Sequence, residues 1–438
     1  MTTIVRVLFV IAICASIMVM APGVVTAAGQ AADGSWRGTM REHGKDLSVS
    51  VSFQRAATGS WSGQFSADSQ AVMEYPLDYV HVNGSTITFV LAGGTFSFLG
   101  QLKSNSIVGT FSTGNDKGTF SLERQSAPTF PYVANHIVFH NGAVKLAGSL
   151  YVPRAPGRHS AVVLLHGSGS QTRWGTLRFI ADRLARNGVA ALIYDKRGSG
   201  DSGGDWRTAS YDVLAGDAVA AIDVLKNRKD INASKIGIWG HSEGGGLAPL
   251  IASRSANVAF IVAADAPATV TYEGDIYRVG NAIRDNGWTG KSGASAMALY
   301  TQFVNVARTG KSYSELQASM KRYESEPWFS FLGISPHDSW VWSWYPLVAN
   351  YDSRKYWPRV EVPVLLVYGE RDRLMPVDAN IATIESLVQS SGNNSVSAII
   401  LPNAPHTLDI EPGPKDAFFW WHIVAGYPDL IIDWIKHA

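Results

Sequence analysis

Cysteine is almost absent from this chain of 438 residues, which contains a single one, Cys14. One thiol provides no pair for an intramolecular disulfide and no set of thiolates for a structural zinc site. Cys14 also lies in an apolar N-terminal segment that we expect to be removed on export, so thiolate catalysis is excluded from the mature protein. Disulfides, Cys-ligated zinc and a cysteine nucleophile therefore need no further consideration.

Excess charge of either sign is missing as well. Lysine and arginine number 37 against 36 aspartate and glutamate residues, which gives a formal net charge of +1. Neither nucleic acid nor an acidic membrane surface is therefore expected as a partner. The chain also lacks an H-E-x-x-H motif, so no metal is expected. Its 46% hydrophobic and 17% charged residues are typical of a globular protein, and its length predicts two domains.

A nearly unbroken apolar run covers residues 7–20 and follows the basic Arg6. With about fourteen residues it is shorter than the roughly 20 that a membrane-spanning helix needs. Val25–Ala27 then provides the small residues that a signal peptidase recognises. Residues 1–27 are therefore predicted to be a signal peptide, and the mature protein to be periplasmic or secreted, without a stable membrane anchor.

Residues 34–126 have the pattern of antiparallel β structure. Leu47–Phe53 and Thr86–Phe89 alternate apolar and polar residues, as half-buried strands do. Turn sequences such as Asn83-Gly84 separate these stretches. The segment is predicted to be a small β sandwich or barrel, and it clusters no His, Asp or Glu in a catalytic spacing. We interpret it as a structural domain, with a binding module for carbohydrate or substrate as the alternative.

A different pattern begins at about residue 136, where apolar strands alternate with amphipathic helices. Strands are expected at 161–165, 190–194, 236–239, 259–263, 364–368 and 397–401. Such alternation predicts a mostly parallel sheet covered by helices on both faces. Residues 269–360 contain no convincing buried strand but many aromatic residues. We expect them to form a helical cap inserted into the domain at 136–438.

The most informative stretch is Gly240-His241-Ser242-Glu243-Gly244, between an expected strand and an expected helix. A serine hydroxyl is a weak nucleophile and must be exposed within reach of a base. A sharp turn from strand to helix, called a nucleophile elbow, would hold Ser242 in a strained conformation at its tip. A Cβ at Gly240 or Gly244 would collide with the neighbouring strand or helix. Ser242 is therefore the predicted nucleophile.

The predicted base is His406, which follows the expected strand at 397–401. Catalytic groups collect at the carboxyl ends of parallel strands. The other late histidines are His422, interpreted as a packed core residue, and His437, interpreted as a solvated one. His406 is thus the candidate whose position in the chain suits a base.

The acid that orients His406 is predicted to be Asp372, which follows the strand at 364–368. Its carboxylate would fix the tautomer of the histidine and stabilise the imidazolium. Three rivals are less suitable. Glu370 is too close to the strand end, Asp378 is expected to begin a helix, and Asp265 ends a strand.

An oxyanion hole is predicted where His166-Gly167-Ser168-Gly169 follows another expected strand. The backbone N–H of Ser168, or that of Gly167, would act together with the N–H of Glu243. One such donor lowers the barrier by about 2.7–4 kcal/mol in well-studied enzymes.

These motifs resemble the α/β-hydrolase superfamily, and more narrowly bacterial carboxylesterases and serine aminopeptidase-like hydrolases with an N-terminal β domain. The resemblance covers about residues 136–438. It rests on His166–Gly169, Asp195–Ser202, Gly240–Gly245, Gly369–Pro376 and Pro405-His406. It implies ester hydrolysis through an acyl-enzyme, with no cofactor.

Two other classes of protein are considered. Gly198-Ser199-Gly200-Asp201-Ser202-Gly203 matches the dinucleotide pattern G-x-G-x-x-G, but no helix is expected to begin there, as a pyrophosphate site requires. A non-catalytic binding module on the same fold would be expected to lack part of the triad, and all three residues are present.

Among hydrolases, a peptidase that releases N-terminal residues and a thioesterase are the alternatives. The peptidase would need carboxylates to bind an α-ammonium group. The cap offers Glu273, Asp275 and Asp285, but also Arg278 and Arg284. Its tryptophans suit an apolar or aromatic acyl group better, so a small-molecule ester is the expected substrate. These tryptophans are Trp288, Trp328, Trp340, Trp342 and Trp344.

Overall fold

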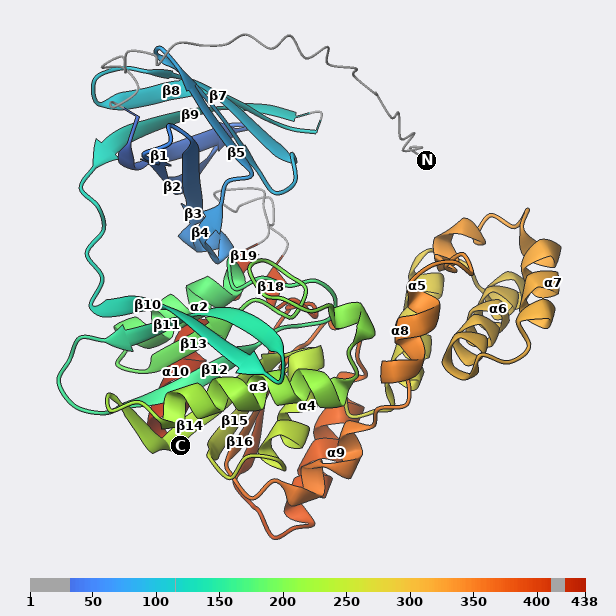
Figure 1. The fold of residues 1–438 in the computed structure, drawn as a ribbon. Coiled ribbons are helices and arrows are strands. Elements are labelled where there is room, and N and C mark those ends of the chain that lie inside the picture. Colours follow the sequence, from blue (N-terminus) through green and yellow to red (C-terminus); the bar gives the residue numbers. More distant parts are fainter. Residues whose placement is uncertain (1–31, 115, 411–421) are drawn as a thin grey trace.

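The computed structural model describes residues 32–114, 116–410 and 422–438 (Figure 1). The predicted signal peptide, residues 1–27, lies outside the described residues. Within these ranges, no helix combines the length and the apolar character that crossing a bilayer requires. A β domain comes first along the chain and is followed by an α/β body, into which a group of projecting helices is inserted.

The first nine strands form one antiparallel sheet in the order β4-β3-β2-β1-β9-β8-β7-β6-β5. The alternation in the sequence puts one face of each strand inside, where the rings of Phe89 and Phe98 stack at 4.3 Å. The sheet curls into a half-barrel rather than forming two packed layers. The strands are β1 (Gly34–Glu42), β2 (Lys45–Arg55), β3 (Trp61–Ala67), β4 (Val72–Pro76), β5 (Tyr79–Asn83), β6 (Thr86–Leu91), β7 (Phe96–Leu102), β8 (Ser106–Thr113) and β9 (Asp116–Gln125).

A second sheet has eight strands in the order β10-β11-β13-β12-β14-β15-β16-β17. The pairs β10/β11 and β11/β13 are antiparallel, and the remaining pairs are parallel. Each apolar strand expected from the sequence is present. The strands are β10 (Tyr132–Asn141), β11 (Val144–Pro153), β12 (His159–Leu165), β13 (Ala190–Tyr194), β14 (Ile231–His241), β15 (Val258–Ala264), β16 (Val364–Gly369) and β17 (Val396–Leu401).

Helices cover both faces of this sheet. On one face α2 (Thr176–Arg186) and α10 (Tyr427–His437) contribute to one hydrophobic cluster. On the other face α3 (Tyr211–Lys226), α4 (Glu243–Ala252) and α9 (Val377–Gln389) contribute to a second cluster. The predicted α/β-hydrolase architecture, a mostly parallel sheet between two layers of helices, is confirmed.

The cap consists of α5 (Thr271–Asp285), α6 (Gly290–Thr309), α7 (Tyr313–Tyr323) and α8 (Val341–Val348). Figure 1 shows these helices projecting from one side of the α/β body. They bury a hydrophobic cluster of their own, in which Trp328 is fully buried. The cap therefore has its own core.

The β domain contacts the α/β body through strand β4 and helix α2. The side chain of Arg178 is 1% exposed, and its Nε donates to Glu74 Oε2 at 2.6 Å. Its Nη2 donates to the hydroxyl of Tyr132 at 2.9 Å, and the guanidinium lies 4.2 Å from the ring centre of Tyr151. This buried arginine therefore links the two parts of the chain.

Replacing Arg178 with methionine is expected to lower the free energy of unfolding by about 3 kcal/mol, because removing one partner leaves a partly buried charge uncompensated. The control is Arg183→Met, which removes an exposed pair across the same contact, 3.9 Å from Asp68, and is expected to cost under about 1 kcal/mol. Urea unfolding followed by circular dichroism measures both. An equal loss of unfolding free energy in the two variants would mean that the buried Arg178 contributes no more to stability than the exposed Arg183.

Candidate active site

Ser242 lies at the turn between β14 and α4, with φ 55° and ψ −115°. This backbone region is costly for a residue with a side chain, and it is typical of a nucleophile elbow. A Cβ on Gly240 would lie 2.4 Å from the Gly244 oxygen, and one on Gly244 would lie 2.8 Å from the His166 oxygen. Glycine at both positions thus allows the close approach of helix, turn and strand that exposes Ser242.

The structure brings Ser242, His406 and Asp372 together in one hydrogen-bonded chain. His406 Nε2 lies 2.9 Å from Ser242 Oγ, and His406 Nδ1 lies 2.7 Å from Asp372 Oδ2. Asp372 Oδ1 accepts hydrogen bonds from the backbone N–H groups of Leu374 and Met375 at 2.7 and 3.0 Å. The carboxylate is fully buried, so the imidazole is held in one orientation.

The predicted oxyanion loop also lies against the elbow. A Cβ built on Gly167 would be 3.9 Å from Ser242 Cβ, and Glu243 is the first residue of α4. Gly167, Ser168 and Glu243 line the same cavity as Ser242 and His406. The N-terminus of α4 adds its own partial positive charge at this place.

The rival residues lie in other positions. Glu370 accepts a hydrogen bond from the Asn403 N–H at 2.7 Å, and Asp378 is in the first turn of α9. His422 is half-buried in the short strand β19 (His422–Ile423), and His437 is exposed at the end of α10. None of these four side chains lines the cavity that Ser242 and His406 share.

Asp265 is the exception among the rivals, because it lies beside the triad. It directly follows β15 and is fully buried, and its carboxylate, Asp372 and His406 offer atoms within 4.8 Å of one another. Its Oδ1 accepts from the Gly369 N–H at 3.0 Å, whereas Oδ2 has no hydrogen-bond partner among the described residues. Burial, and then the neighbouring Asp372 carboxylate, raise the pKa of Asp265 well above its ordinary value. Both effects favour the protonated form of Asp265.

Two further histidines next to the site are neutral. His241 Nε2 donates to the His406 backbone oxygen at 2.8 Å, and His166 Nε2 donates to the Tyr194 oxygen at 2.5 Å. Burial and the charge of Lys196 lower the pKa of His166 to about 3. Burial and His406 lower the pKa of His241 to about 4. Both rings serve to hold backbone in place rather than to accept a substrate proton.

These lowered values predict a loss of stability in acid. Above the ordinary histidine pKa of 6.5, His166 is neutral in both the folded and the unfolded chain. Below that pH the unfolded chain binds a proton at His166, whereas the folded protein binds it only near pH 3. The unfolded state is therefore favoured as the pH falls. The contribution of this residue between pH 7 and pH 5 is roughly 2 kcal/mol. In urea titrations, His166→Asn is therefore expected to lose less stability over that interval than the wild type. Identical losses would contradict this assignment.

A cavity of about 810 Å³ lies between the sheet edge and the cap and is lined by Ser242 and His406. Of the five cap tryptophans expected to suit an acyl group, Trp344 lines it. The other four are not among its lining residues. Trp328 belongs to the cap core, Trp288 packs on Phe331, Trp340 packs on Trp206, and Trp342 packs on Phe303 and Tyr313. The aromatic residues that line the cavity are Tyr211, Trp239, Tyr300, Phe303, Trp344, Tyr345, Tyr351 and Tyr427.

Two charged cap residues, Asp275 and Arg278, also line this cavity. The Tyr345 hydroxyl donates to Asp275 Oδ2 at 2.8 Å, and Arg278 Nη2 lies 3.5 Å from Asp275 Oδ1. Burial raises the pKa of Asp275. Both carboxylate oxygens thus have a partner already. The other charged cap residues named above do not line the cavity; these are Glu273, Arg284 and Asp285.

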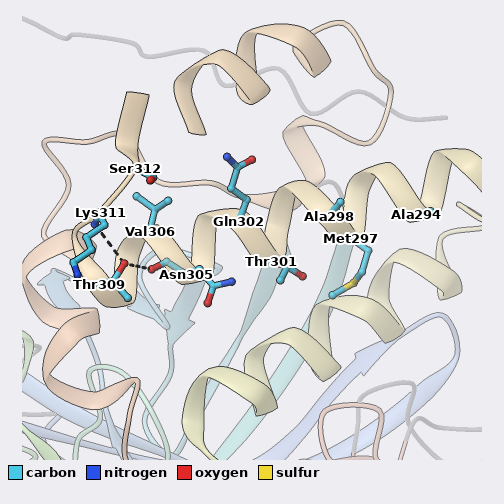
Figure 2. Close-up of a pocket in the computed structure, with 10 residues that line it drawn as sticks. All are labelled: Ala294, Met297, Ala298, Thr301, Gln302, Asn305, Val306, Thr309, Lys311 and Ser312. Atoms are coloured by element: carbon cyan, nitrogen blue, oxygen red, sulfur yellow. Dashed lines mark hydrogen bonds between the residues drawn. The ribbon is translucent and has the colours of Figure 1, made fainter. Parts of the chain in front are cut away.

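A second hollow, of about 790 Å³, follows α6 and the turn after it (Figure 2). Two hydrogen bonds join three of its polar residues: the Thr309 hydroxyl donates to the Asn305 backbone oxygen and accepts from the Lys311 backbone N–H. It shares no lining residue with the cavity at Ser242, and Lys311 is the one ionisable group among the described residues that line it. The candidate chemistry belongs to the first cavity.

Two features of the site were not predicted from the sequence: a role for Lys196, and the close approach of Asp265 to Asp372 and His406. Lys196 Nζ lies 2.5 Å from Glu243 Oε1 and 3.1 Å from the Gly167 oxygen. A signal was present, since three charged residues, Asp195 to Arg197, directly follow the fully buried strand β13. Polar groups at a buried strand end require partners, although the sequence does not say which ones.

Known proteins are similar to this chain over part of its length. Esterase EstD of Thermotoga maritima is 26% identical over 277 residues, which cover 60% of this chain and 58% of EstD. The quorum-quenching protein AidA of Acinetobacter baumannii is 30% identical over 140 residues, which cover 32% of this chain and 45% of AidA. The chain thus spans about half the length of these curated relatives. A solved esterase of Pyrococcus furiosus gives a TM-score of 0.44 at 19% identity, over 72% of this chain and 94% of that one.

The family model of the serine aminopeptidases, S33, matches residues 157–413, which is more than half of the chain. The match begins just before β12 and includes the elbow, the cap and the segments with Asp372 and His406. Because of this match, and because its second sheet has the architecture of an α/β hydrolase, the chain belongs to the S33 serine aminopeptidase family of α/β hydrolases.

Proposed function

We propose that this hydrolase cleaves carboxylic esters through an acyl-enzyme formed on Ser242. The observation that carries the proposal is the chain of two hydrogen bonds, 2.9 and 2.7 Å long, from the strained Ser242 through His406 to Asp372. A serine hydroxyl, an imidazole and a buried carboxylate in this order form the minimal machinery for acyl transfer.

In the proposed mechanism, His406 Nε2 takes the proton of Ser242 Oγ while that oxygen attacks the ester carbonyl. The carbonyl oxygen becomes an oxyanion, which accepts hydrogen bonds from the N–H groups of Ser168 and Glu243. His406 then protonates the departing alcohol, and the acyl group remains on Ser242. Water then attacks the acyl group while His406 takes its proton, and His406 returns that proton to Ser242 Oγ as the acid leaves. Asp372 holds His406 Nδ1–H and stabilises the imidazolium in both halves.

The cavity supports an ester with an apolar or aromatic acyl part, because side chains such as Phe303 and Trp344 line it. The curated relative EstD is named an esterase, which agrees with this choice. A peptidase acting on N-terminal residues is the second candidate, since Asp275 lines the same cavity. An incoming ammonium group would have to compete with Arg278 and Tyr345 for Asp275, which favours the ester.

A substrate panel separates these activities. We expect the purified protein to hydrolyse p-nitrophenyl esters and not aminoacyl-p-nitroanilides, with acyl-CoA thioesters as a third arm. Anilides cleaved in preference to esters would establish the peptidase, and preferred cleavage of acyl-CoA would establish a thioesterase. Inactivity on all three would count against the proposal.

A further inference from the structure

Lys196 is a buried residue that contacts both segments of the candidate oxyanion hole. Its side chain is 5% exposed, and Nζ donates to the Gly167 oxygen at 3.1 Å and to Glu243 Oε1 at 2.5 Å. The ammonium also lies 5.9 Å from the ring centre of Trp206. An ammonium has three donors and no acceptor, and here a carbonyl and a carboxylate each accept one of its N–H groups.

The bond to Gly167 fixes the direction of the next N–H. The carbonyl of Gly167 and the N–H of Ser168 belong to one peptide unit, which is planar and trans, so they point in opposite directions. Holding the Gly167 oxygen toward Lys196 therefore turns the Ser168 N–H away from Lys196. Gly167 and Ser168 line the cavity at Ser242, and the Ser168 N–H is the donor proposed above for the oxyanion.

The bond to Glu243 anchors the residue that carries the other donor. Glu243 is the first residue of α4, and its side chain is 4% exposed. One ammonium thus connects the oxyanion loop to the first turn of the helix after Ser242, two segments far apart in the sequence.

We propose that Lys196 is a positioning residue for the oxyanion hole, which it assembles by holding the Gly167 carbonyl and the Glu243 side chain at once. This inference rests on the proposed esterase function. Because Lys196 is paired with the Glu243 carboxylate, the two charges offset each other, and Lys196 acts through the orientation of the N–H groups rather than through net positive charge.

The test uses the full protein with Lys196→Met, which keeps the length of the side chain and removes its donors. Removing one oxyanion donor typically costs 10²–10³-fold in kcat; misdirecting one is expected to cost roughly 10–100-fold, with KM little changed. The inhibition constant of an aryl trifluoromethyl ketone is expected to rise by the same factor, since Ser242 adds to its carbonyl carbon and leaves an oxyanion in the hole.

Two further variants make the result interpretable. Lys196→Met leaves a buried carboxylate unpaired, so Lys196→Met/Glu243→Gln is measured beside it; the double variant removes both charges and is expected to fold with the same loss of kcat. The matched control is Arg197→Met, which breaks the adjacent buried pair with Asp217, 2.5 Å long. It is expected to lower stability while leaving kcat and ketone binding of the folded protein near wild type.

The outcomes separate the two proposals. If wild-type ester hydrolysis depends on Ser242 but both Lys196 variants keep kcat and ketone inhibition within about threefold, the role of Lys196 is wrong and the esterase proposal stands. The same conclusion follows if Lys196→Met resembles Arg197→Met and loses stability alone. If the wild type cleaves no ester, or if Ser242→Ala cleaves esters as the wild type does, the proposed function is wrong. The inference about Lys196 is then wrong as well.

Discussion

Replacing Ser242 with alanine is expected to lower kcat for ester hydrolysis by roughly 10⁶-fold, as removal of the nucleophile does in serine proteases. The residual rate comes from substrate binding and the oxyanion donors alone. The melting temperature is expected to change little, because the substitution removes one hydroxyl and its 2.9 Å contact with His406. Steady-state kinetics on a p-nitrophenyl ester and a thermal melt measure the two effects.

The control for this variant is Ser253→Ala at the other end of α4. Its hydroxyl donates to the Leu250 oxygen at 2.7 Å and does not line the cavity. This variant is expected to keep the wild-type kcat. Turnover by Ser242→Ala within about tenfold of the wild type would mean that Ser242 is not the nucleophile.

The second large effect is expected for Asp372→Asn, with a loss of about 10⁴-fold in kcat. An asparagine amide in place of Oδ2 would present a donor to His406 Nδ1 and favour the wrong tautomer of the ring. The backbone bonds from Leu374 and Met375 to Oδ1 can persist, so the fold is expected to be retained. Kinetics at neutral pH measure the loss.

Asp265→Asn is the matched comparison, because Asp265 is the other buried carboxyl group at the same place. Burial and the Asp372 carboxylate raise the pKa of Asp265 well above its ordinary value and so favour its neutral form. An amide of the same size can keep the bond from the Gly369 N–H to Oδ1. The expected loss is under about tenfold, or 1.4 kcal/mol of barrier. If Asp265→Asn loses more activity than Asp372→Asn, Asp265 is the orienting acid.

The sequence predicts well what depends on neighbours along the chain. The run from Ile236 to Gly246 contains a buried strand, glycines on either side of the serine and a helix start, and these alone determine a sharp turn with Ser242 at its tip. The positions of Asp372 and His406 follow from one further rule, that parallel strands place their carboxyl ends at one edge.

What depends on contacts between distant segments was not predictable in the same way. Period and composition show that the cap tryptophans are apolar, but which of them face the cavity depends on how α5–α8 pack together. Trp328 and Trp344 are indistinguishable by residue type, and yet one is in the cap core and the other lines the cavity. Lys196 and Glu243 likewise meet because β13 and β14 are both neighbours of β12, a sheet order that no local pattern contains.

The proposed role of Ser242 as the nucleophile can be tested directly by mass spectrometry. After the protein is incubated with a fluorophosphonate and digested, we predict one adduct per chain, on the peptide that contains Ser242. The adduct is expected to be absent from Ser242→Ala and to form much more slowly in Asp372→Asn. An adduct on another residue, or ester hydrolysis that continues after complete labelling of Ser242, would contradict the proposed mechanism.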